Sequence, residues 1–534
     1  MRIWRPVALF ALLTVVMTWP QAAHLATHAA DHQDVFFNMW RFGWFAHALA
    51  TSPSHLLDGN IFYPEARTLT FSDAMPVESL LAAPMLWAGV PPVLVHNLML
   101  LGAIVLSGAG ACVLARRVTG SAAAGVTAGI VFAFAPYRFE HFMHMELQWT
   151  VWTPWAFWAL DRTLETGRRR YGLLTGACVA LQMLSSVYYG IFLGVVLGLC
   201  AVLLLVTQRQ RVRTAFAALA IGGVMAAAVS AAYSVPYLRT KTETGGRGES
   251  EILRFSAKPS SYLVATDTNY LYGARSQSRG RPERRLFPGI LPCLLAVFGL
   301  LAVRPTRHVA AYLVALAVAF EMSLGLYGHS YGFLYEHVPL FEGLRAPARL
   351  GIYVVFFLGL LAAHGHAALE AVIPPLARRV VAVLIPLLLL VEYWVVPIPL
   401  LAYVNTPPPL YRWLAQQPRG VVLELPIPQP DSLPGDDARY GYMSTFHWMP
   451  LANGYSGFYP PSYLARLVAL AHIPDETSAQ RIRADGVRYL IVHPASYENG
   501  LGGDVLARIS ASPHFTQLGV FFDGRADAAV FAVR

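Results

Sequence analysis

Long apolar runs with almost no charged residue constrain this chain more than any other feature of its sequence. The stretches 92–115, 172–206, 214–236 and 351–368 are such runs. A helix needs roughly 20 apolar residues to cross about 30 Å of hydrocarbon, and core helices of soluble proteins are usually shorter. Only 13% of the residues are charged and 56% are hydrophobic, whereas a soluble domain is about 25% charged. The pattern predicts a polytopic α-helical membrane protein.

Basic residues at the ends of these runs predict the topology, because Lys and Arg near helix ends favour the cytoplasm. Arg2 and Arg5 precede the first run, which we interpret as a retained helix and not a cleaved signal peptide. The chain is expected to have about eleven spans in all, including this first one, with a cytoplasmic N-terminus. The segment 79–90 is too short to span, so we expect it to lie along the membrane or dip into it. The expected spans are 6–24, 92–115, 121–137, 148–163, 172–188, 190–206, 214–236, 288–303, 309–325, 350–368 and 380–398.

Outer loops separate these spans at 25–78, 138–147, 237–287 and 326–349. The third loop is rich in Lys and Arg, which by itself favours the cytoplasm. The short basic turns on the other side, such as Arg116-Arg117 and Arg378-Arg379, nevertheless support one consistent orientation. We therefore expect a transmembrane domain over 1–399.

The final segment, 400–534, has a different composition, with many prolines and short apolar runs. Strands are predicted at 420–425, 487–493, 517–523 and 528–533, and helices at 411–416 and 462–472. We expect a soluble α/β domain on the outer side of the membrane.

Two carboxylates, Asp31 and Asp34, open the first outer loop, just before the aromatic stretch Phe36–Trp40. Ionisable residues close to a membrane face often mark function. One interpretation is a general base or a metal-binding carboxylate. The other is a helix cap, a common role for Asp ahead of a helix. Both interpretations stay open at this point.

The second outer loop places His141, His144 and Glu146 within one short turn. Residues three apart share a helix face, so the histidines could hold a divalent metal such as Mg²⁺ or Mn²⁺, or position a phosphate or sugar. Histidines bonded to lipid headgroups are the alternative.

Arginines of the outer side are the candidates for binding a lipid phosphate. Arg345 and Arg349 flank the short apolar sequence before span 350–368 and could grip a phosphate bidentately. Arg138 and Tyr189 are further candidates for contact with the substrate. The alternative is that these side chains are interfacial anchors or packing residues. No Walker A, Rossmann or nucleophile-elbow pattern is present, and no nucleic-acid partner is expected.

Four motifs together resemble the GT-C superfamily of membrane glycosyltransferases, and more narrowly bacterial YfhO-like multispan proteins. The motifs are Asp34 with Trp40 and Trp44, Asn60-x-Phe62-Tyr63-Pro64, Phe134–Arg138, and Leu344–Arg349. The resemblance implies a polyprenyl-phosphate sugar donor, a glycan or lipid acceptor, and a place in the bacterial cytoplasmic membrane of the cell envelope. It also implies that Asp34, or secondarily Asp31, is the catalytic base, with a further acidic or histidine site among Glu140, His141, His144 and Glu146.

The expected function is therefore sugar transfer to an acceptor hydroxyl on the outer face. The adjacent Asp-Glu pair of protein O-mannosyltransferases is missing, which disfavours a protein acceptor. One alternative is a transporter, flippase or assembly factor for lipid-linked sugars, which needs no carboxylate base. Another is a polysaccharide ligase or polymerase that depends on outer arginines and a histidine.

Overall fold

A computed structural model describes residues 3–207, 212–245, 248–276, 281–302 and 305–534. These residues form two compact units. The first comprises Met1–His24, Leu98–Val235 and Gly245–Pro399; the second comprises Leu25–Asn97, Pro236–Thr244 and Leu400–Arg534. The division differs from a single cut after residue 399, because two earlier segments pack with the C-terminal residues. Several basic residues used for the topology lie outside the described residues: Arg2, Arg209, Arg211, Arg247, Arg279 and Arg304.

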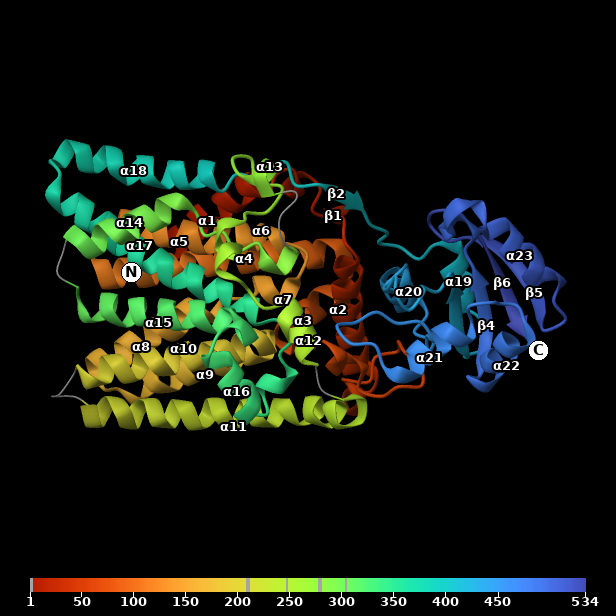
Figure 1. Cartoon of the computed structure of the whole chain (residues 1–534). Coiled ribbons are helices and arrows are strands. Elements are labelled where there is room, and N and C mark those ends of the chain that lie inside the picture. Colours follow the sequence, from red (N-terminus) through yellow and green to blue (C-terminus); the bar gives the residue numbers. More distant parts are fainter. Residues whose placement is uncertain (1–2, 208–211, 246–247, 277–280, 303–304) are drawn as a thin grey trace. The chain divides into compact units, whose positions relative to one another are not determined.

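Each of the eleven segments predicted as spans contains a helix (Figure 1). These helices are α1 (Trp4–Met17), α4 (Pro92–Thr119), α5 (Ala122–Phe134), α8 (Trp152–Thr166), α9 (Arg169–Ser185), α10 (Val187–Val206), α11 (Val212–Thr244), α14 (Ile290–Ala302), α15 (Arg307–Ser323), α17 (Gly351–Val372) and α18 (Pro375–Glu392). In the described part of the chain, five helices are long and apolar enough to cross a membrane. They are Pro92–Thr119, Ala122–Glu140, Val187–Val206, Val212–Thr244 and Pro347–Val372. The number eleven stays a prediction.

Helix α17 lies in the core of the first unit, and α5, α14 and α15 pack against it (Figure 1). Almost all of its residues are buried, as expected for a helix that is apolar on every side. By contrast, α18 exposes large apolar side chains, among them Leu376, Val380 and Val383. Exposed apolar faces of this kind mark contact with a membrane or with another protein.

Helices α14 and α17 approach closely at Gly299 and Gly365. A Cβ atom at Gly365 would overlap the carbonyl oxygen of Leu295 and lie 3.3 Å from the backbone nitrogen of Gly299. Small residues at helix contacts let backbones approach in this way. We expect Gly365→Val to lower the free energy of unfolding by about 1–3 kcal/mol through overpacking. Thermal unfolding of the detergent-solubilised protein measures this.

Gly194 provides the matched control for that substitution. It also lies in a long apolar helix, α10, but a Cβ atom there would meet nothing within 4 Å. Gly194→Val should leave the unfolding temperature nearly unchanged, and equal behaviour of the two variants would contradict the proposed close contact.

In the second unit, strand β1 (His28–Ala30) pairs antiparallel with β2 (Leu400–Ala402). This pairing links segment 25–78, predicted as the first outer loop, to the start of the C-terminal segment. Helices α2 (Gln33–Thr51) and α3 (Pro76–Trp87) pack against each other in the same unit. The 12-residue α3 covers most of the short apolar segment 79–90, which is too short to cross a bilayer.

The C-terminal segment 400–534, which is described throughout, contains a four-stranded sheet of order β3-β4-β6-β5 (Figure 1). Strand β3 is parallel to β4, whereas β6 is antiparallel to both β4 and β5. Every predicted strand is present: β3 (Val421–Leu425), β4 (Val487–Val492), β5 (Phe515–Phe522) and β6 (Asp527–Val533). The predicted helices are also present, as α19 (Pro409–Ala415) and α21 (Pro461–Ala469).

Helices α20 (Asp437–Met443), α22 (Glu476–Ala484) and α23 (Gly502–Ala511) were not predicted. Each is short, and α22 carries several charged residues. A start signal for α22 was nevertheless readable, because Asp475 caps the helix by accepting a hydrogen bond of 2.8 Å from the backbone N–H of Ser478.

Candidate active site

Asp34 lies in the first turn of α2, where the helix dipole favours a negative charge. The residue that caps this helix is His32, whose Nδ1 accepts a hydrogen bond of 3.1 Å from the backbone N–H of Asp34. Neither predicted aspartate is therefore the N-cap, and Asp31 is exposed just before the helix. The capping alternative for the two aspartates is wrong, although Asp34 does stabilise the same helix end by its charge.

Tyr455 orients the carboxylate of Asp34. Its hydroxyl donates a hydrogen bond of 2.5 Å to Oδ1 of Asp34, and Nδ1 of His32 lies 3.6 Å from Oδ2. The aspartate side chain is 15% exposed. Phe37, one turn further along α2, packs edge-on against the ring of Tyr455 at 5.3 Å. The aromatic stretch after Asp34 thus holds the tyrosine that positions the carboxylate, and the carboxylate remains within reach of solvent.

His141 follows the short helix α6 (Pro136–Glu140) and is 1% exposed. Its ring contacts those of Tyr137 at 4.7 Å and His144 at 5.5 Å. Burial lowers the pKa of His141 to about 3, so the imidazole is neutral. The described residues contain no group of three or more His, Cys, Asp or Glu side chains arranged to hold a metal ion. The predicted metal site of His141, His144 and Glu146 therefore has no geometric support.

Arg349 lies in the 3-10 turn η8 (Pro347–Leu350), with its side chain 8% exposed. Its NH2 and Nε groups donate to Oε1 of Glu283 at 2.8 and 3.3 Å. The guanidinium also lies over the ring of Tyr188, 4.8 Å from the centroid. Burial opposes ionisation of Glu283, but Arg349 and then His141 hold the pKa of that carboxyl well below its usual range. A charged pair therefore occupies the predicted phosphate-binding position.

Two more arginines of this unit, Arg345 and Arg285, also have carboxylate partners. Arg345 lies 3.3 Å from Glu251, and its backbone N–H donates to the hydroxyl of Tyr188 at 2.9 Å. Arg285 contacts Glu140 at 3.2 Å and Asp267 at 2.9 Å. The acidic partners on loop 237–287 were missed because the sequence was interpreted there by its bases alone. The sequence did contain an indication of this pairing, since three acids, Glu251, Asp267 and Glu283, lie along that basic loop.

The two remaining predicted substrate contacts, Arg138 and Tyr189, are fully buried, at 1% and 0% exposure. Arg138 donates to the carbonyl oxygens of Phe132 at 2.7 Å and Gln148 at 2.9 Å. The hydroxyls of Tyr189 and Tyr137 are 3.0 Å apart. Buried polar groups are satisfied by such partners. The structure thus favours a structural role for Arg138 and Tyr189 over the predicted contact with substrate.

Asp34 and Tyr455 belong to the second unit, whereas Arg345, Arg349 and the His141 loop belong to the first. The family model of a domain of unknown function, DUF6311, matches residues 6–392. The chain belongs to the DUF6311 family. No curated protein matches its sequence.

Solved structures similar to this DUF6311 chain include the cryo-EM structure of the arabinofuranosyltransferase AftD from mycobacteria, with a TM-score of 0.68 at 16% identity. That alignment covers 100% of this chain and 40% of AftD, so the chain spans well under half the length of AftD. A variant of AftD gives a TM-score of 0.63 at 17% identity, covering 100% of this chain and 41% of the variant. ArnT from Cupriavidus metallidurans gives 0.39 at 13% identity, covering 98% of this chain and 97% of ArnT.

The similarity to AftD confirms the resemblance to the GT-C superfamily at the level of the fold. With its apolar helices, the DUF6311 chain is a multi-pass membrane protein with a GT-C-like fold. A shared fold does not by itself assign an activity.

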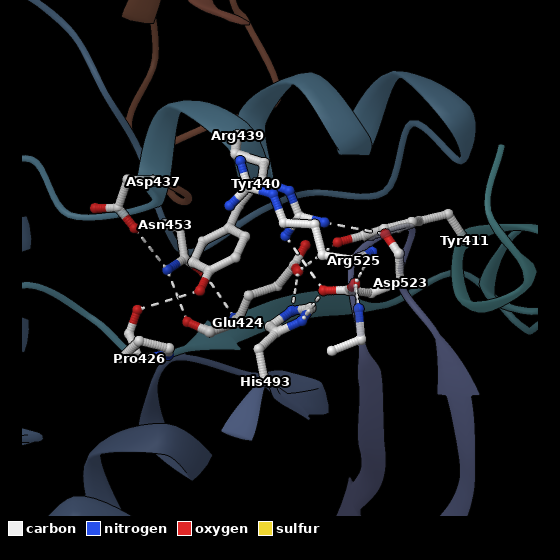
Figure 2. A network of polar contacts seen from close by, with 11 residues as sticks. Tyr411, Glu424, Pro426, Asp437, Arg439, Tyr440, Asn453, His493, Asp523 and Arg525 are labelled. Carbon is white, nitrogen blue, oxygen red and sulfur yellow. Dashed lines mark hydrogen bonds and ion pairs between the residues drawn. The ribbon is translucent and has the colours of Figure 1, made fainter. Parts of the chain in front are cut away.

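A second polar cluster of this DUF6311 protein lies in its C-terminal sheet (Figure 2). His493 follows β4, and its two ring nitrogens lie 2.7 Å from Oδ2 of Asp523 and 2.7 Å from Oε2 of Glu424. Arg439 donates to the same Asp523 oxygen at 3.2 Å, and the Tyr411 hydroxyl donates to Glu424 at 2.9 Å. All five residues are buried. Because each nitrogen of His493 faces a carboxylate, the imidazole donates from both and carries a positive charge.

This cluster was not predicted from the sequence. Glu424 lies within a predicted strand, while His493 and Asp523 each end one. A polar residue at the end of an otherwise apolar strand was the feature that could have indicated a buried polar cluster. Only the strand order brings the three together, because β3 and β4 are parallel neighbours and Asp523 directly follows β5.

The cluster predicts how the stability of this sheet depends on pH. Burial opposes protonation of His493, but hydrogen bonds to Asp523 and Glu424 raise its pKa above 6.5. The stability that the protonated imidazole contributes to the sheet is therefore lost as pH rises through that raised pKa. Burial raises the pKa of the nearby Asp437 from 3.8 to about 7. Ionisation of Asp437 therefore lowers stability as pH rises toward 7. Both effects have the same sign.

We expect the β3 and β4 amides of the full chain to exchange hydrogen faster at about pH 8 than at about pH 5, after correction for intrinsic rates. Hydrogen-exchange mass spectrometry measures this. Asp437→Asn should reduce the difference, and corrected rates that do not change with pH would contradict the prediction.

Proposed function

We propose that this chain is a membrane glycosyltransferase that moves a sugar from a polyprenyl-phosphate donor to an acceptor hydroxyl on the outer face of the bacterial cytoplasmic membrane. The observation that carries the proposal is the partly exposed carboxylate of Asp34, held at the start of α2 by a 2.5 Å hydrogen bond from Tyr455. It belongs to a chain that has the fold of AftD, an arabinofuranosyltransferase.

In this mechanism, Asp34 accepts the proton of the acceptor hydroxyl as the acceptor oxygen attacks the anomeric carbon. The bond between that carbon and the phosphate oxygen breaks, and the lipid phosphate leaves with the bonding electrons. General-base catalysis of this kind contributes about 10²–10⁴-fold. Cationic side chains stabilise the charge that develops on the leaving phosphate, and Arg345 and Arg349 are the candidates for this role.

The geometry supports Asp34 over Asp31 as the base. Asp31 is exposed and lies just before the helix. Asp34 has an orienting hydroxyl and a fixed place on a helix. A base that is held in position transfers protons more efficiently than one that moves freely.

The test compares Asp34→Asn and Arg345→Ala, separately, in one transfer assay with a radiolabelled polyprenyl-phosphate sugar and purified full-length protein. An enzyme that uses Asp34 as base loses transfer in the first variant and loses donor affinity in the second. A lipid-linked sugar transporter gives no transfer in this assay even when unmodified, whereas a ligase or a polymerase keeps transfer without Asp34 but not without Arg345. That second pattern, in folded protein, would reject the proposed function.

A further inference from the structure

Glu283 binds Arg349 as an anionic ligand would. Its Oε1 accepts hydrogen bonds from two groups of the same guanidinium, at 2.8 and 3.3 Å. The pair is shielded from solvent, with side chains 8% and 13% exposed. A phosphate oxygen makes the same charge-assisted contact with arginine. The carboxylate of Glu283 and the phosphate of a lipid donor are therefore chemically equivalent ligands for Arg349.

The second oxygen of Glu283 faces His141. Nε2 of His141 lies 3.7 Å from Oε2 of Glu283, longer than the 2.7–3.2 Å of typical hydrogen bonds to nitrogen donors. Within the described residues, this oxygen and both ring nitrogens of His141 are buried without a hydrogen-bond partner. Buried polar groups nearly always have partners, so an unsatisfied pair at this separation points to a second arrangement in which the two groups bond.

We propose that Glu283 is a placeholder for the phosphate of the lipid donor: when that phosphate binds Arg349, Glu283 moves to His141, and Nε2 of His141 takes up one proton from water. The inference rests on the proposed function, and it adds a device that couples donor binding to protonation. No bond other than the new N–H forms, and the proton comes from solvent.

Charge balance gives the physical reason. Before binding, Arg349 and Glu283 neutralise each other beside a neutral His141. After binding, the phosphate neutralises Arg349, which leaves Glu283 as an uncompensated charge in a buried place unless His141 becomes cationic. An isolated buried charge is strongly unfavourable. One proton per singly charged phosphate keeps the site neutral throughout.

The groups around His141 support this exchange. Burial lowers the pKa of His141 to about 3; Glu283 opposes this effect, while His144 and Arg349 add to it. The neutral ring of Tyr137 packs against the imidazole at 4.7 Å. A phosphate on Arg349 removes the repulsion from that arginine, and the shift of Glu283 brings its negative charge closer. Both changes favour the imidazolium.

The test measures proton uptake by the full-length protein in detergent. The probe is methyl farnesyl phosphate, a phosphodiester whose single charge does not change near neutral pH. Titration calorimetry at about pH 7.5 in two buffers of different ionisation enthalpy gives the number of protons exchanged. We expect uptake of about one proton per ligand in the unmodified protein.

Two variants separate the roles. Glu283→Gln should bind the probe about tenfold more tightly, because no carboxylate competes for Arg349, and should take up no proton. His141→Gln should bind more weakly and also take up none. Glu165→Gln is the matched control, since Glu165 also pairs with arginines, Arg117 and Arg162, but is half exposed. It should change neither affinity nor proton uptake.

The outcomes are distinguishable. If the unmodified protein binds the probe without proton uptake, and folded Glu283→Gln binds no more tightly, the placeholder is rejected while phosphate binding stands. If the probe does not bind at all, the placeholder and the phosphate role of Arg349 both fail, and Asp34-dependent transfer is judged by its own assay. If Glu283→Gln does not fold, proton uptake that persists in His141→Gln rejects the inference.

Discussion

Replacing Asp34 by Asn should lower the rate of sugar transfer by about 10²–10⁴-fold, the usual contribution of a general base. Asparagine keeps the size of the side chain and can still accept the hydrogen bond from Tyr455. It cannot accept a proton from the acceptor hydroxyl. The effect should therefore appear in the maximal rate, with little change in donor affinity or in the unfolding temperature. A transfer assay at saturating donor measures it.

Two further variants make this result specific. Asp31→Asn removes a nearby carboxylate that is exposed, and its activity should stay within about threefold of the unmodified protein, as surface changes usually do little. Tyr455→Phe removes the hydroxyl that orients Asp34 and should give an intermediate loss. Full activity in Asp34→Asn would reject Asp34 as the base.

Replacing His493 by Leu should destabilise the C-terminal sheet by about 3–5 kcal/mol, the range found when one partner of a buried ion pair is removed. Without the imidazolium, Glu424 and Asp523 remain as buried carboxylates, at 0% and 3% exposure (Figure 2). Arg439 forms an ion pair with Asp523 and, among the described residues, none with Glu424. Faster hydrogen exchange in β3 and β4 of the full-length protein measures the loss.

His514 provides the control for this substitution. It also pairs with a carboxylate, with its Nε2 3.0 Å from Glu476, but that glutamate is 60% exposed. His514→Gln should cost less than about 1 kcal/mol, as exposed ion pairs do. Similar exchange in the two variants would contradict the importance of burial at His493.

Much of the local structure was predictable. A helix was found in every apolar segment predicted as a span, and each predicted C-terminal strand is present. Both features depend on the pattern of neighbouring residues, which a sequence displays directly. Short helices such as α22 and α23 were missed because each is only two or three turns long. Over so few residues, the spacing of apolar residues hardly distinguishes a helix from a loop.

The sites were predictable only as single residues. Asp34, Arg345 and Arg349 were identified by type and position, but their partners were not. Tyr455 is 421 residues from Asp34 along the chain, and no local pattern connects the two. Glu283 looked like one acid in a basic loop, and its pairing with Arg349 reversed the expectation of a freely available arginine.

The sequence by itself determined that this chain crosses a membrane, where its helices and C-terminal strands lie, and which family it resembles. These follow from local hydrophobicity, because transfer into lipid acts on each segment separately. The tertiary structure decided which charges meet. It paired Arg345 and Arg349 with carboxylates, buried Arg138 and Tyr189, and enclosed His493 between two acids. Such pairings depend on burial and on short distances between distant segments, which only the folded chain establishes.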